Sequence, residues 1–214
     1  MKDIAGIRRQ YDAHELHQKD LNDSPVEQFK LWLGQAIDSE LFKDPTAMCL
    51  ATVDDQGLPS QRMVLLKDYD ERGFVFYTNL ESNKAQHLAN NPQICLHFAW
   101  LELERQVIIR GRATKLSIAE NTEYFLSRPH DSQLAAWASQ QSKPVATRKM
   151  LEQAFGQMKA KFAKGKVPLP GFWGGYRVEP VTIEFWQGRE NRLHDRFLYS
   201  KSEDQNWSVQ RLQP

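Results

Sequence analysis

Residues 185–199, FWQGRENRLHDRFLY, concentrate positive charge between two apolar runs of the chain. The alternation predicts a strand over residues 192–199, in which Arg192, His194 and Arg196 share one face of a sheet. Three cationic or potentially cationic side chains on one face repel one another unless water or an anion lies before them. The segment is therefore either an edge strand with a solvated, protective charged face or a site for an anionic ligand. Taken alone, it favours the edge strand.

Two other features indicate phosphate recognition. Arg62 and Lys67 bracket the apolar MVLL, and in an extended strand their opposite parity directs them to different faces, where they could serve two separate anions. Ser82 and Lys84 stand at a predicted helix start, where free N–H groups and the helix dipole favour an anion. Each of these cations, taken singly, is better explained as a surface side chain with a solvated head group.

A third set could offer two hydroxyls and a guanidinium to a phosphate: Tyr124, Arg128 and Ser132. Tyr124 and Arg128 are four residues apart and so share a helix face, while Ser132 follows Pro129 at the start of the next predicted helix. The alternative explanation is an ordinary exposed helix end.

Other familiar chemistry is missing from the sequence. It contains neither a GxxxxGK[ST] loop nor a GxGxxG after a strand, which argues against an NTPase and a dinucleotide-binding Rossmann domain. The histidines lack metal-ligand spacing, so no metal site is expected. Cys49 and Cys95 lie in apolar runs without CxxC spacing, which favours buried, reduced thiols in a cytoplasmic protein.

The composition is that of a soluble globular protein of one domain: 214 residues, 41% hydrophobic and 26% charged. A formal net charge of +1 gives no general attraction to nucleic acid or to an anionic membrane, so any anion site must be local. The longest apolar runs are too short to span a membrane, and the first residues lack the apolar core of a signal peptide. A cytoplasmic location is therefore expected.

Short β-prone runs separated by turn sequences such as DDQG and DYDERG dominate the chain from residue 46 onwards. Tight connections require antiparallel pairing, because parallel crossovers need more chain, and we expect the first five runs to close into a barrel. Those five are TAMCLATV (46–53), QRMVLLK (61–67), GFVFYTN (73–79), QICLHFAW (93–100) and RQVIIRGRATKL (105–116), and three later runs are VTIEFW, RLHDRFLY and WSVQRL. The expected fold class is mostly β with helices (α+β), antiparallel.

Helices are predicted between these runs, at residues 24–39, 82–88, 117–128, 131–141 and 147–162. Ser24 and Ser117 each begin a capping box, and Asp131 could cap the fourth helix. Residues 164–175 are predicted to form a Pro/Gly-rich loop. Residues 1–20 lack clean periodicity and are predicted to be a mobile N-terminal arm, with 21–214 as a single domain.

Taken together and in order, these motifs resemble those of the pyridoxamine 5'-phosphate oxidase family over nearly the whole chain. The motifs are RMVLLK (62–67), FYTN (76–79), LERQV (103–107), SRPxDSQ (127–133), FWGGYR (172–177) and EFWQG…RLHDRF (184–197). The resemblance implies a homodimer of FMN-binding split β-barrel subunits, with FMN at the subunit interface. It also implies the oxidation of pyridoxamine and pyridoxine 5'-phosphates by dioxygen to pyridoxal 5'-phosphate, releasing hydrogen peroxide and, from the amine, ammonia.

The resemblance also implies roles for individual residues. Arg62 and Lys84 would hold the FMN phosphate, with Gln141 and Ser142 supplied by the partner subunit. The rest of the flavin site would comprise Met63, Val64, Leu65, Leu66, Lys67, Tyr77, Thr78, Asn83, Gln106, Trp186 and Arg196. The substrate phosphate would contact Lys67, Tyr124, Arg128 and Ser132, and the substrate ring would contact Arg192, Leu193 and His194, of which Arg192 and His194 are the catalytic pair. Arg8 and Tyr11 of the arm would act as a lid.

One position departs from the family, which often has Arg before the flavin-site lysine where this chain has Asn83. Three alternatives stay open. A flavin reductase with a nicotinamide donor would leave the substrate-phosphate set unexplained, and a carrier for FMN or pyridoxal phosphate would not need Arg192 or His194. A nucleic-acid-binding barrel is disfavoured by the balanced charge. No nucleic acid or membrane partner is expected.

Overall fold

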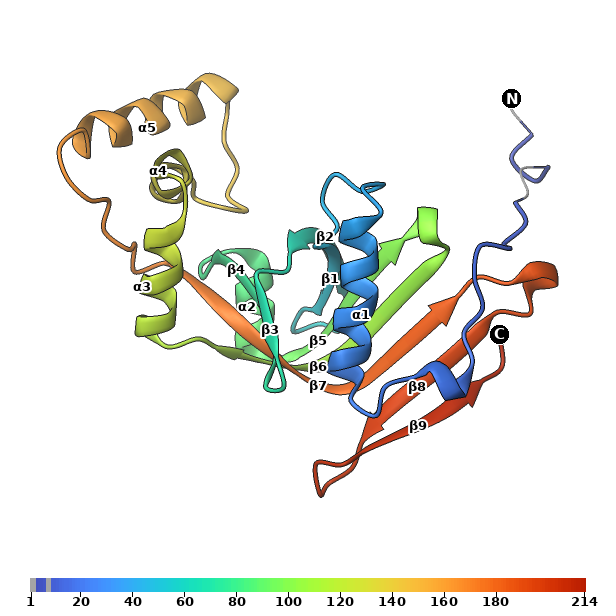
Figure 1. Ribbon diagram of the computed structural model, residues 1–214. Helices are drawn as coiled ribbons and strands as arrows, with labels where there is room; N and C mark the ends of the chain where they lie inside the picture. Colours follow the sequence, from blue (N-terminus) through green and yellow to red (C-terminus); the bar gives the residue numbers. More distant parts are fainter. Residues whose placement is uncertain (1–2, 7–8) are drawn as a thin grey trace.

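A computed structural model describes residues 3–6 and 9–214 and has one antiparallel sheet of nine strands (Figure 1). Seven strands follow the order β2-β1-β5-β6-β7-β4-β3, while β8 pairs with β7 and β9 with β8. The bounds are β1 Ala47–Val53, β2 Pro59–Leu65, β3 Asp68–Asp70, β4 Gly73–Asn79, β5 Gln93–Trp100, β6 Arg105–Lys115, β7 Trp173–Gln187, β8 Asp195–Lys201 and β9 Trp207–Leu212. The antiparallel α+β prediction is confirmed, but the first five runs do not close a barrel by themselves, because β7 lies between β6 and β4 in the strand order.

The long strand β7 organises the sheet. Its first half pairs with β4 and its second half with β8, while β6 pairs on the other side with residues Tyr176 to Gln187. Figure 1 shows β7 leading from the region of α3–α5 to the region of β8 and β9. Residues at the two ends of this strand are therefore held far apart within one subunit.

Helix α1, Pro25–Asp38, lies across one face of the sheet and supplies the main core with apolar side chains at helical spacing (Figure 1). Phe29 meets Phe74 edge-on with ring centroids 5.0 Å apart, and Trp32 meets Phe185 at 5.2 Å. Ser24 is the N-cap, and its hydroxyl accepts hydrogen bonds from the first-turn N–H groups of Val26 and Glu27. The predicted capping box is only half formed, because the described bonds include none from the Ser24 N–H to the Glu27 carboxylate.

The other helices are α2 Asn83–Asn90, α3 Ile118–Ser127, α4 His130–Ala138 and α5 Arg148–Lys161, with short 3-10 turns η1 Gln18–Asp20, η2 Leu101–Leu103 and η3 Glu190–Arg192. The capping box of Ser117 and Glu120 is confirmed. The predicted cap of α4 is wrong by two positions, because Pro129 is its N-cap and Asp131 lies in its first turn. A second core cluster of Phe125, Leu134, Val167 and Trp173 joins α3 and α4 to the start of β7.

Four predictions about strands are wrong by two residues or more. The strand predicted at 61–67 is β2, which begins and ends two residues earlier. DYDERG contains the short strand β3, because the backbone of 68–70 pairs with β4 before the turn. The strand β7 begins at Trp173, within the segment predicted as a loop, because it continues the pairing with β4. The strand β8 begins at Asp195 and not at residue 192, because Asn191 and Arg192 adopt positive φ angles of 55° and 63°.

The segment from residue 9 to 20 lies along the body of the protein. Leu16 is buried in the main core, and its N–H donates to the carboxylate of Asp195 at 3.1 Å. The mobility of residues 1–20 stays a prediction. Among the residues that the structure describes, no helix is both long and apolar enough to cross a membrane.

Candidate active site

A cavity of about 670 Å³ lies between β2, β4, α2 and the junction of α3 with α4, and is called here the Lys84 cavity. Its lining comprises Arg62, Met63, Val64, Leu65, Lys67, Tyr77, Thr78, Asn79, Lys84, Tyr124, Arg128, Pro129, Ser132, Gln141 and Trp173. Four of these residues are cationic, and none of the described lining residues is acidic. The cavity therefore suits a strongly anionic ligand.

Lys84 is the most enclosed cation of the cavity. It lies in the first turn of α2 and is only 8% exposed. Its ammonium donates to Thr78 Oγ1 at 3.0 Å and to Gln141 Oε1 at 2.7 Å, and both acceptors are neutral. Burial, together with the nearby charge of Arg62, lowers the pKa of Lys84 to about 8. Near neutral pH the site thus holds a desolvated positive charge without a carboxylate partner.

Gln141 and Ser142 lie beside the α2 start of their own chain. Gln141 Oε1 accepts from Thr78 Oγ1 at 3.0 Å, and Ser142 Oγ accepts from the backbone N–H of Asn83 at 3.3 Å. This placement differs from the expectation that the partner subunit supplies these two residues. The reason is local: the chain leaving α4 turns back over β4 and α2, and Ser142 has a positive φ of 73° within that turn.

The Arg62 guanidinium is held on the side of β1 and β2 by hydrogen bonds from one nitrogen, Nη1. Its Nη1 lies 2.7 Å from Thr52 Oγ1, 3.1 Å from the carbonyl of Ser60 and 3.3 Å from that of Leu50. Its Nε and Nη2 have no hydrogen-bond acceptor within the described chain. Burial lowers the pKa of this guanidinium, yet it stays protonated. Two sets of N–H donors therefore remain for an anion in the cavity.

Arg128 follows the last residue of α3, and its Nη1 is buried without any hydrogen-bond partner in the described chain. The guanidinium lies over the Trp173 ring, 4.8 Å from its centroid. Burial lowers the pKa of Arg128. A buried donor without a partner is costly, and a charged one more so. The orphaned nitrogen is the clearest sign of a missing ligand.

Three nearly parallel aromatic rings form one wall of the cavity. The Tyr77 ring stacks on Tyr124 at 3.9 Å and on Trp173 at 5.2 Å between centroids, and burial raises the pKa of Tyr77 to about 12. Gly175 makes room for this wall, because a Cβ there would lie 2.8 Å from the Tyr77 ring. Both phenols remain neutral and can donate hydrogen bonds to an anion.

Lys67 lies beyond the end of β2, so the parity of that strand does not govern it. The prediction that Arg62 and Lys67 serve different faces is wrong: both line the Lys84 cavity. Lys67 also lines an adjoining cavity of about 400 Å³, together with Tyr77 and Tyr124. Tyr124, Arg128 and Ser132 do gather in one place, as the sequence predicted.

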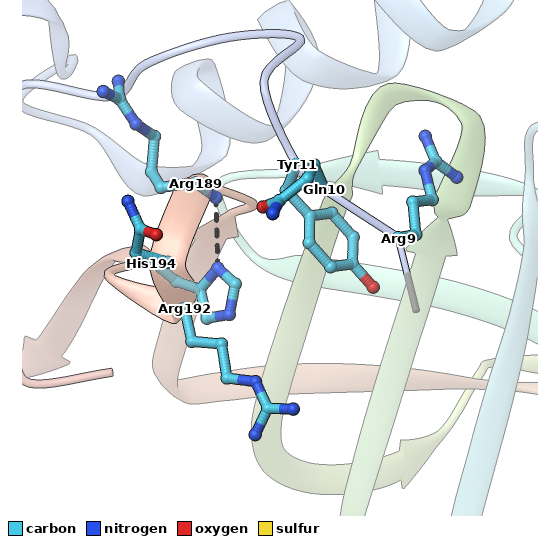
Figure 2. A pocket seen from close by; sticks show the side chains of 7 residues that line it. Arg9, Gln10, Tyr11, Arg189, Arg192 and His194 are labelled. Atoms are coloured by element: carbon cyan, nitrogen blue, oxygen red, sulfur yellow. Dashed lines mark hydrogen bonds between the residues drawn. The ribbon is translucent and has the colours of Figure 1, made fainter. Parts of the chain in front are cut away.

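A second cavity, of about 550 Å³, lies at the far end of β7 and is called here the Arg192 cavity (Figure 2). Its lining is Arg9, Gln10, Tyr11, Arg189, Asn191, Arg192 and His194. Gly188 lets the N-terminal segment approach, since a Cβ there would lie 2.7 Å from the Tyr11 ring.

The His194 imidazole is held in one orientation. Its Nδ1 lies 3.1 Å from the backbone nitrogen of Arg189, which donates to it (Figure 2). Its ring contacts Trp186 and Tyr11 at centroid distances of 4.6 and 5.6 Å. Because Nδ1 accepts that N–H, the neutral ring carries its proton on Nε2. Burial, reinforced by the charge of Arg192, lowers the pKa of His194, so the neutral form prevails at pH 7.

The predicted common face of Arg192, His194 and Arg196 does not exist, because the first two precede β8. Arg196 lies on β8, and its Nε donates to the carboxylate of Glu184 at 2.7 Å. Arg189 pairs with Glu15 at 2.6 Å. Carboxylates of the same chain therefore neutralise much of the charge in this segment, and Arg192 is left facing the cavity.

Gln106, Trp186 and Arg196 form a row across three neighbouring strands. The register pairs Gln106 with Trp186 between β6 and β7, and Trp186 with Arg196 between β7 and β8. Directly opposed residues point to the same face of an antiparallel pair, so the three side chains lie together. This cross-strand row adjoins the Arg192 cavity through the contact of Trp186 with His194.

The remaining predicted residues are placed as follows. Leu66 packs in the main core and does not line the Lys84 cavity, because the chain turns inward after β2. Leu193 is 69% exposed, and Asn83 reaches Ser142 only through its backbone. Arg8 lies outside the described residues.

Sequence reasoning missed three residues that shape these cavities: Asn79, Trp173 and Glu104. FWGGYR was noted as a motif, but nothing in it says that Trp173 stacks against Arg128. Glu104 is buried with a left-handed backbone (φ 55°), and its carboxylate accepts from Arg9 Nη2 at 2.8 Å and from the N–H of Ala13 at 3.0 Å. The available sequence signal was an acidic residue between an apolar segment and the next predicted strand.

Glu104→Ala is expected to release the N-terminal segment, because it removes the carboxylate that accepts from Arg9 and Ala13 and leaves only the longer bond of 3.5 Å from Arg9 to the Leu101 carbonyl. Trypsin cleavage after Arg9 should accelerate about tenfold, in line with an opening energy lowered by one to two kcal/mol. The measurement is the rate of cleavage followed by mass spectrometry. The exposed neighbour Glu102→Ala is the matched control, and equal rates for the two variants would contradict the anchoring role.

Comparison with known proteins agrees with this arrangement. The family model described as pyridoxamine 5'-phosphate oxidase matches residues 36–162, and the model of the pyridoxine 5'-phosphate oxidase C-terminal dimerisation region matches residues 173–214. The chain belongs to the pyridoxamine 5'-phosphate oxidase family. The resemblance inferred from the motifs is thereby confirmed, as is the expectation of an oxidase.

Relatives and solved structures in this family cover nearly the whole chain. The pyridoxine/pyridoxamine 5'-phosphate oxidase of Hahella chejuensis is 66% identical over 97% of this chain and 98% of its own length. That of Vibrio cholerae is 58% identical, covering 99% of this chain and 100% of its own. The crystal structure of PhzG from Burkholderia lata, in complex with tetrahydrophenazine-1-carboxylic acid, superposes with a TM-score of 0.88 at 29% identity, covering 96% and 100% of the two chains. An FMN-binding protein of Nostoc punctiforme shares the fold with a TM-score of 0.73 at 17% identity, covering 89% and 98%.

Proposed function

We propose that this protein uses FMN to oxidise pyridoxamine 5'-phosphate and pyridoxine 5'-phosphate to pyridoxal 5'-phosphate. Dioxygen is the electron acceptor, hydrogen peroxide is released, and the amine substrate also yields ammonia. The observation that carries the proposal is the Lys84 cavity, which holds two groups of phosphate donors. One group is Arg62 with Lys84, and the other is Arg128 with Lys67, Tyr124 and Ser132.

The cavity fits the phosphate of FMN at the end formed by α2. Lys84 is desolvated, has only neutral partners and lies in the first turn of α2, where the helix dipole favours an anion. Arg62 offers the donors that the protein leaves unused. Asn83, at the position where the family often has Arg, contributes no charge there, so the affinity for the phosphate rests on Lys84 and Arg62.

The substrate phosphate is assigned to Arg128 and its neighbours. The buried Nη1 of Arg128 gains an acceptor when a phosphate enters, and the hydroxyls of Tyr124 and Ser132 flank the same space. Because Trp173 holds the guanidinium by stacking, little side-chain freedom is lost on binding.

The cross-strand row and the Arg192 cavity complete the site from a second copy of the chain. Tyr77 of the Lys84 cavity pairs with Gly175, and Trp186 lies toward the other end of β7, roughly 35 Å further along the strand. One flavin cannot bridge that distance within one subunit. In a two-fold homodimer the row of one copy can face the Lys84 cavity of the other. The family's C-terminal dimerisation region contains Trp186 and Arg196.

A bound flavin would supply the redox chemistry, as acceptor of a hydride equivalent from the substrate carbon that bears the amine or alcohol and as donor of electrons to dioxygen. The protein contributes position. His194 is neutral with its proton on Nε2, so it donates a hydrogen bond to the substrate and does not act as a base through that nitrogen. Arg192 stays protonated and offers a planar group to cover an aromatic ring.

Other oxidoreductase functions on this fold account for fewer of the residues that line the Lys84 cavity. A reductase with a nicotinamide donor has no use for Arg128, Lys67 and Ser132 at the far side of the cavity. A substrate such as the phenazine acid bound to PhzG carries a carboxylate but no phosphate. The purified protein should therefore show a flavin spectrum that is bleached anaerobically by pyridoxamine 5'-phosphate and restored by air. Bleaching by NADPH alone would favour the reductase, and a colourless protein that takes up no FMN would refute the proposal.

The division of the site between two copies can be tested by mixing two impaired variants and assaying them at substrate concentrations well below the wild-type KM, where each variant alone has little activity. Arg128→Ala damages the Lys84 cavity, and Arg192→Ala damages the Arg192 cavity. After unfolding and refolding together, half of the dimers are mixed and each holds one intact site, so about a quarter of the full activity should return. Mixing Arg128→Ala with Lys84→Ala, both in one cavity, should restore none. Equal recovery in the two mixtures would contradict the division.

Arg192→Lys is expected to slow single-turnover flavin reduction at least tenfold, because an ammonium keeps the charge but not the flat fork. His194→Gln should retain partial activity, since its amide reaches the position of Nε2 and can still donate that hydrogen bond. FMN content, read from the absorbance of each variant, should be unchanged. Complete loss of reduction in His194→Gln with substrate still bound would instead assign proton transfer to His194.

A further inference from the structure

We infer that His87 is a positioning residue for the FMN phosphate, acting on Arg62 through the hydroxyl of Thr52. The inference rests on the proposed function, because it takes Arg62 to be a phosphate ligand. His87 lies in the last turn of α2, the helix whose first turn carries Lys84, and it does not line the Lys84 cavity.

The Thr52 hydroxyl is the centre of the network. Thr52 lies on β1 and is completely buried, and its Oγ1 accepts from Arg62 Nη1 at 2.7 Å. The hydroxyl hydrogen needs an acceptor of its own, since a buried donor left without one is destabilising. Within the described chain the other polar atom at hydrogen-bond distance is His87 Nδ1, at 3.0 Å.

The direction of the bonds follows from this geometry. A hydroxyl has one hydrogen to donate, and Arg62 can only donate, so Thr52 must donate to His87. His87 Nδ1 is then an unprotonated acceptor, and the ring carries its proton on Nε2. The relay His87–Thr52–Arg62 thereby holds Nη1 against β1 and presents the remaining donors of Arg62 to the cavity.

The relay predicts a particular pattern among substitutions. His87→Asn should keep FMN affinity within about threefold, because Asn Oδ1 occupies nearly the position of Nδ1. His87→Gln reaches to the position of Nε2 instead, so it should weaken FMN as much as His87→Ala does, by roughly tenfold. Thr52→Val should produce a similar loss by removing the oxygen that fixes Arg62.

Titration of apoprotein with FMN, followed by quenching of flavin fluorescence, measures these effects. Asn90→Ala, at the exposed end of the same helix, is the matched control and should bind as the wild type does. The decisive comparison is the double variant, since His87→Ala should cost nothing further once Thr52 is valine. Additive losses, full affinity in His87→Ala, or equal affinities of the Asn and Gln variants would each overturn the relay.

Two further measurements separate this inference from the proposed function and from a general loss of stability. Riboflavin lacks the phosphate, so its affinity should not change in His87→Ala, whereas a loosened fold would weaken both ligands. The ¹⁵N spectrum of His87 in the apoprotein should show an unprotonated Nδ1 whether or not FMN binds. A protonated Nδ1 would refute the relay, while wild-type protein that fails to bind FMN would refute only the proposed function.

Discussion

Replacing Arg128 with alanine is expected to raise the KM for pyridoxamine 5'-phosphate about ten- to a hundredfold while leaving FMN affinity nearly unchanged. The magnitude is that of one lost charge-assisted hydrogen bond to phosphate, about 1.5–3 kcal/mol. Steady-state kinetics at saturating FMN measure the KM, and fluorescence titration measures the FMN affinity. A variant that lost FMN and kept its KM would show that Arg128 belongs to the flavin phosphate.

The same site predicts an opposite effect on the stability of the apoprotein. The buried Nη1 of Arg128 has no acceptor within the described chain, so the folded apoprotein carries an uncompensated charge. Arg128→Met, which keeps the stacking over Trp173, should therefore unfold at the same urea concentration as wild type or a higher one. Arg128→Lys is the control, because lysine keeps the positive charge but lacks the planar guanidinium. Its KM should lie between that of the wild type and that of Arg128→Met. Strong destabilisation by methionine would mean that Arg128 has a structural partner.

Lys84→Met is expected to weaken FMN binding about ten- to a hundredfold, as Arg128→Ala weakens substrate binding. It should also remove the pH dependence of FMN affinity above pH 8. The apoprotein pKa of Lys84 is lowered to about 8, mainly by burial, and an adjacent phosphate favours the protonated form and raises that pKa again. Above pH 8, binding must therefore be accompanied by proton uptake at Lys84. The dissociation constant of wild type should rise up to tenfold per pH unit there, and that of Lys84→Met should stay flat.

Titrations at a series of pH values between 6.5 and about 10, with riboflavin as the ligand without phosphate, test this dependence. Riboflavin affinity should not follow the protonation of Lys84. The stability of the apoprotein should depend on pH in the opposite direction from FMN affinity. Because Lys84 binds its proton more tightly in the unfolded chain, the free energy of unfolding should rise with pH between about 8 and 10.5. An FMN affinity independent of pH in wild type would remove Lys84 from the phosphate site.

A chain with a net charge of +1 builds two cationic cavities by placing its acids elsewhere. Arg196 pairs with Glu184, Arg177 with Asp70 and Arg211 with Asp195, all within 3 Å. The described lining of the Lys84 cavity contains no carboxylate, so its cations stay available for phosphate. Local distribution of charge therefore decides anion binding here, and the overall charge does not.

Local sequence was sufficient for many of the elements. Short β-prone runs bounded by turn residues predicted β4, β5 and β9 with the bounds that the structure has. Ser117 with Glu120 predicted the start of α3 for a reason contained within four residues, a reciprocal pair of hydrogen bonds. The ordered motifs identified the family, because residue types at fixed positions need no knowledge of how the chain folds.

Elements whose bounds depend on a distant partner could not be predicted in this way. The strand β7 begins at Trp173 because β4 is there to pair with it, and β3 exists for the same reason. The start of β8 at Asp195 depends on positive φ angles at Asn191 and Arg192, which residues other than glycine rarely adopt. The sequence alternates with period two through these residues, which predicted a common strand face for Arg192, His194 and Arg196. The backbone does not form that face, because the strand begins only at Asp195.

The sequence by itself determined which residues were available for phosphate chemistry, while tertiary structure alone decided how they group. Arg62 and Lys67 share a cavity because the chain turns after β2, and Gln141 meets Lys84 because the segment after α4 folds back on its own chain. The row of Gln106, Trp186 and Arg196 arises from the register of three strands. Thr52 and His87 are joined only by the packing of α2 on β1. Contacts of this kind depend on residues far apart in the chain, and no local pattern encodes the distance between them.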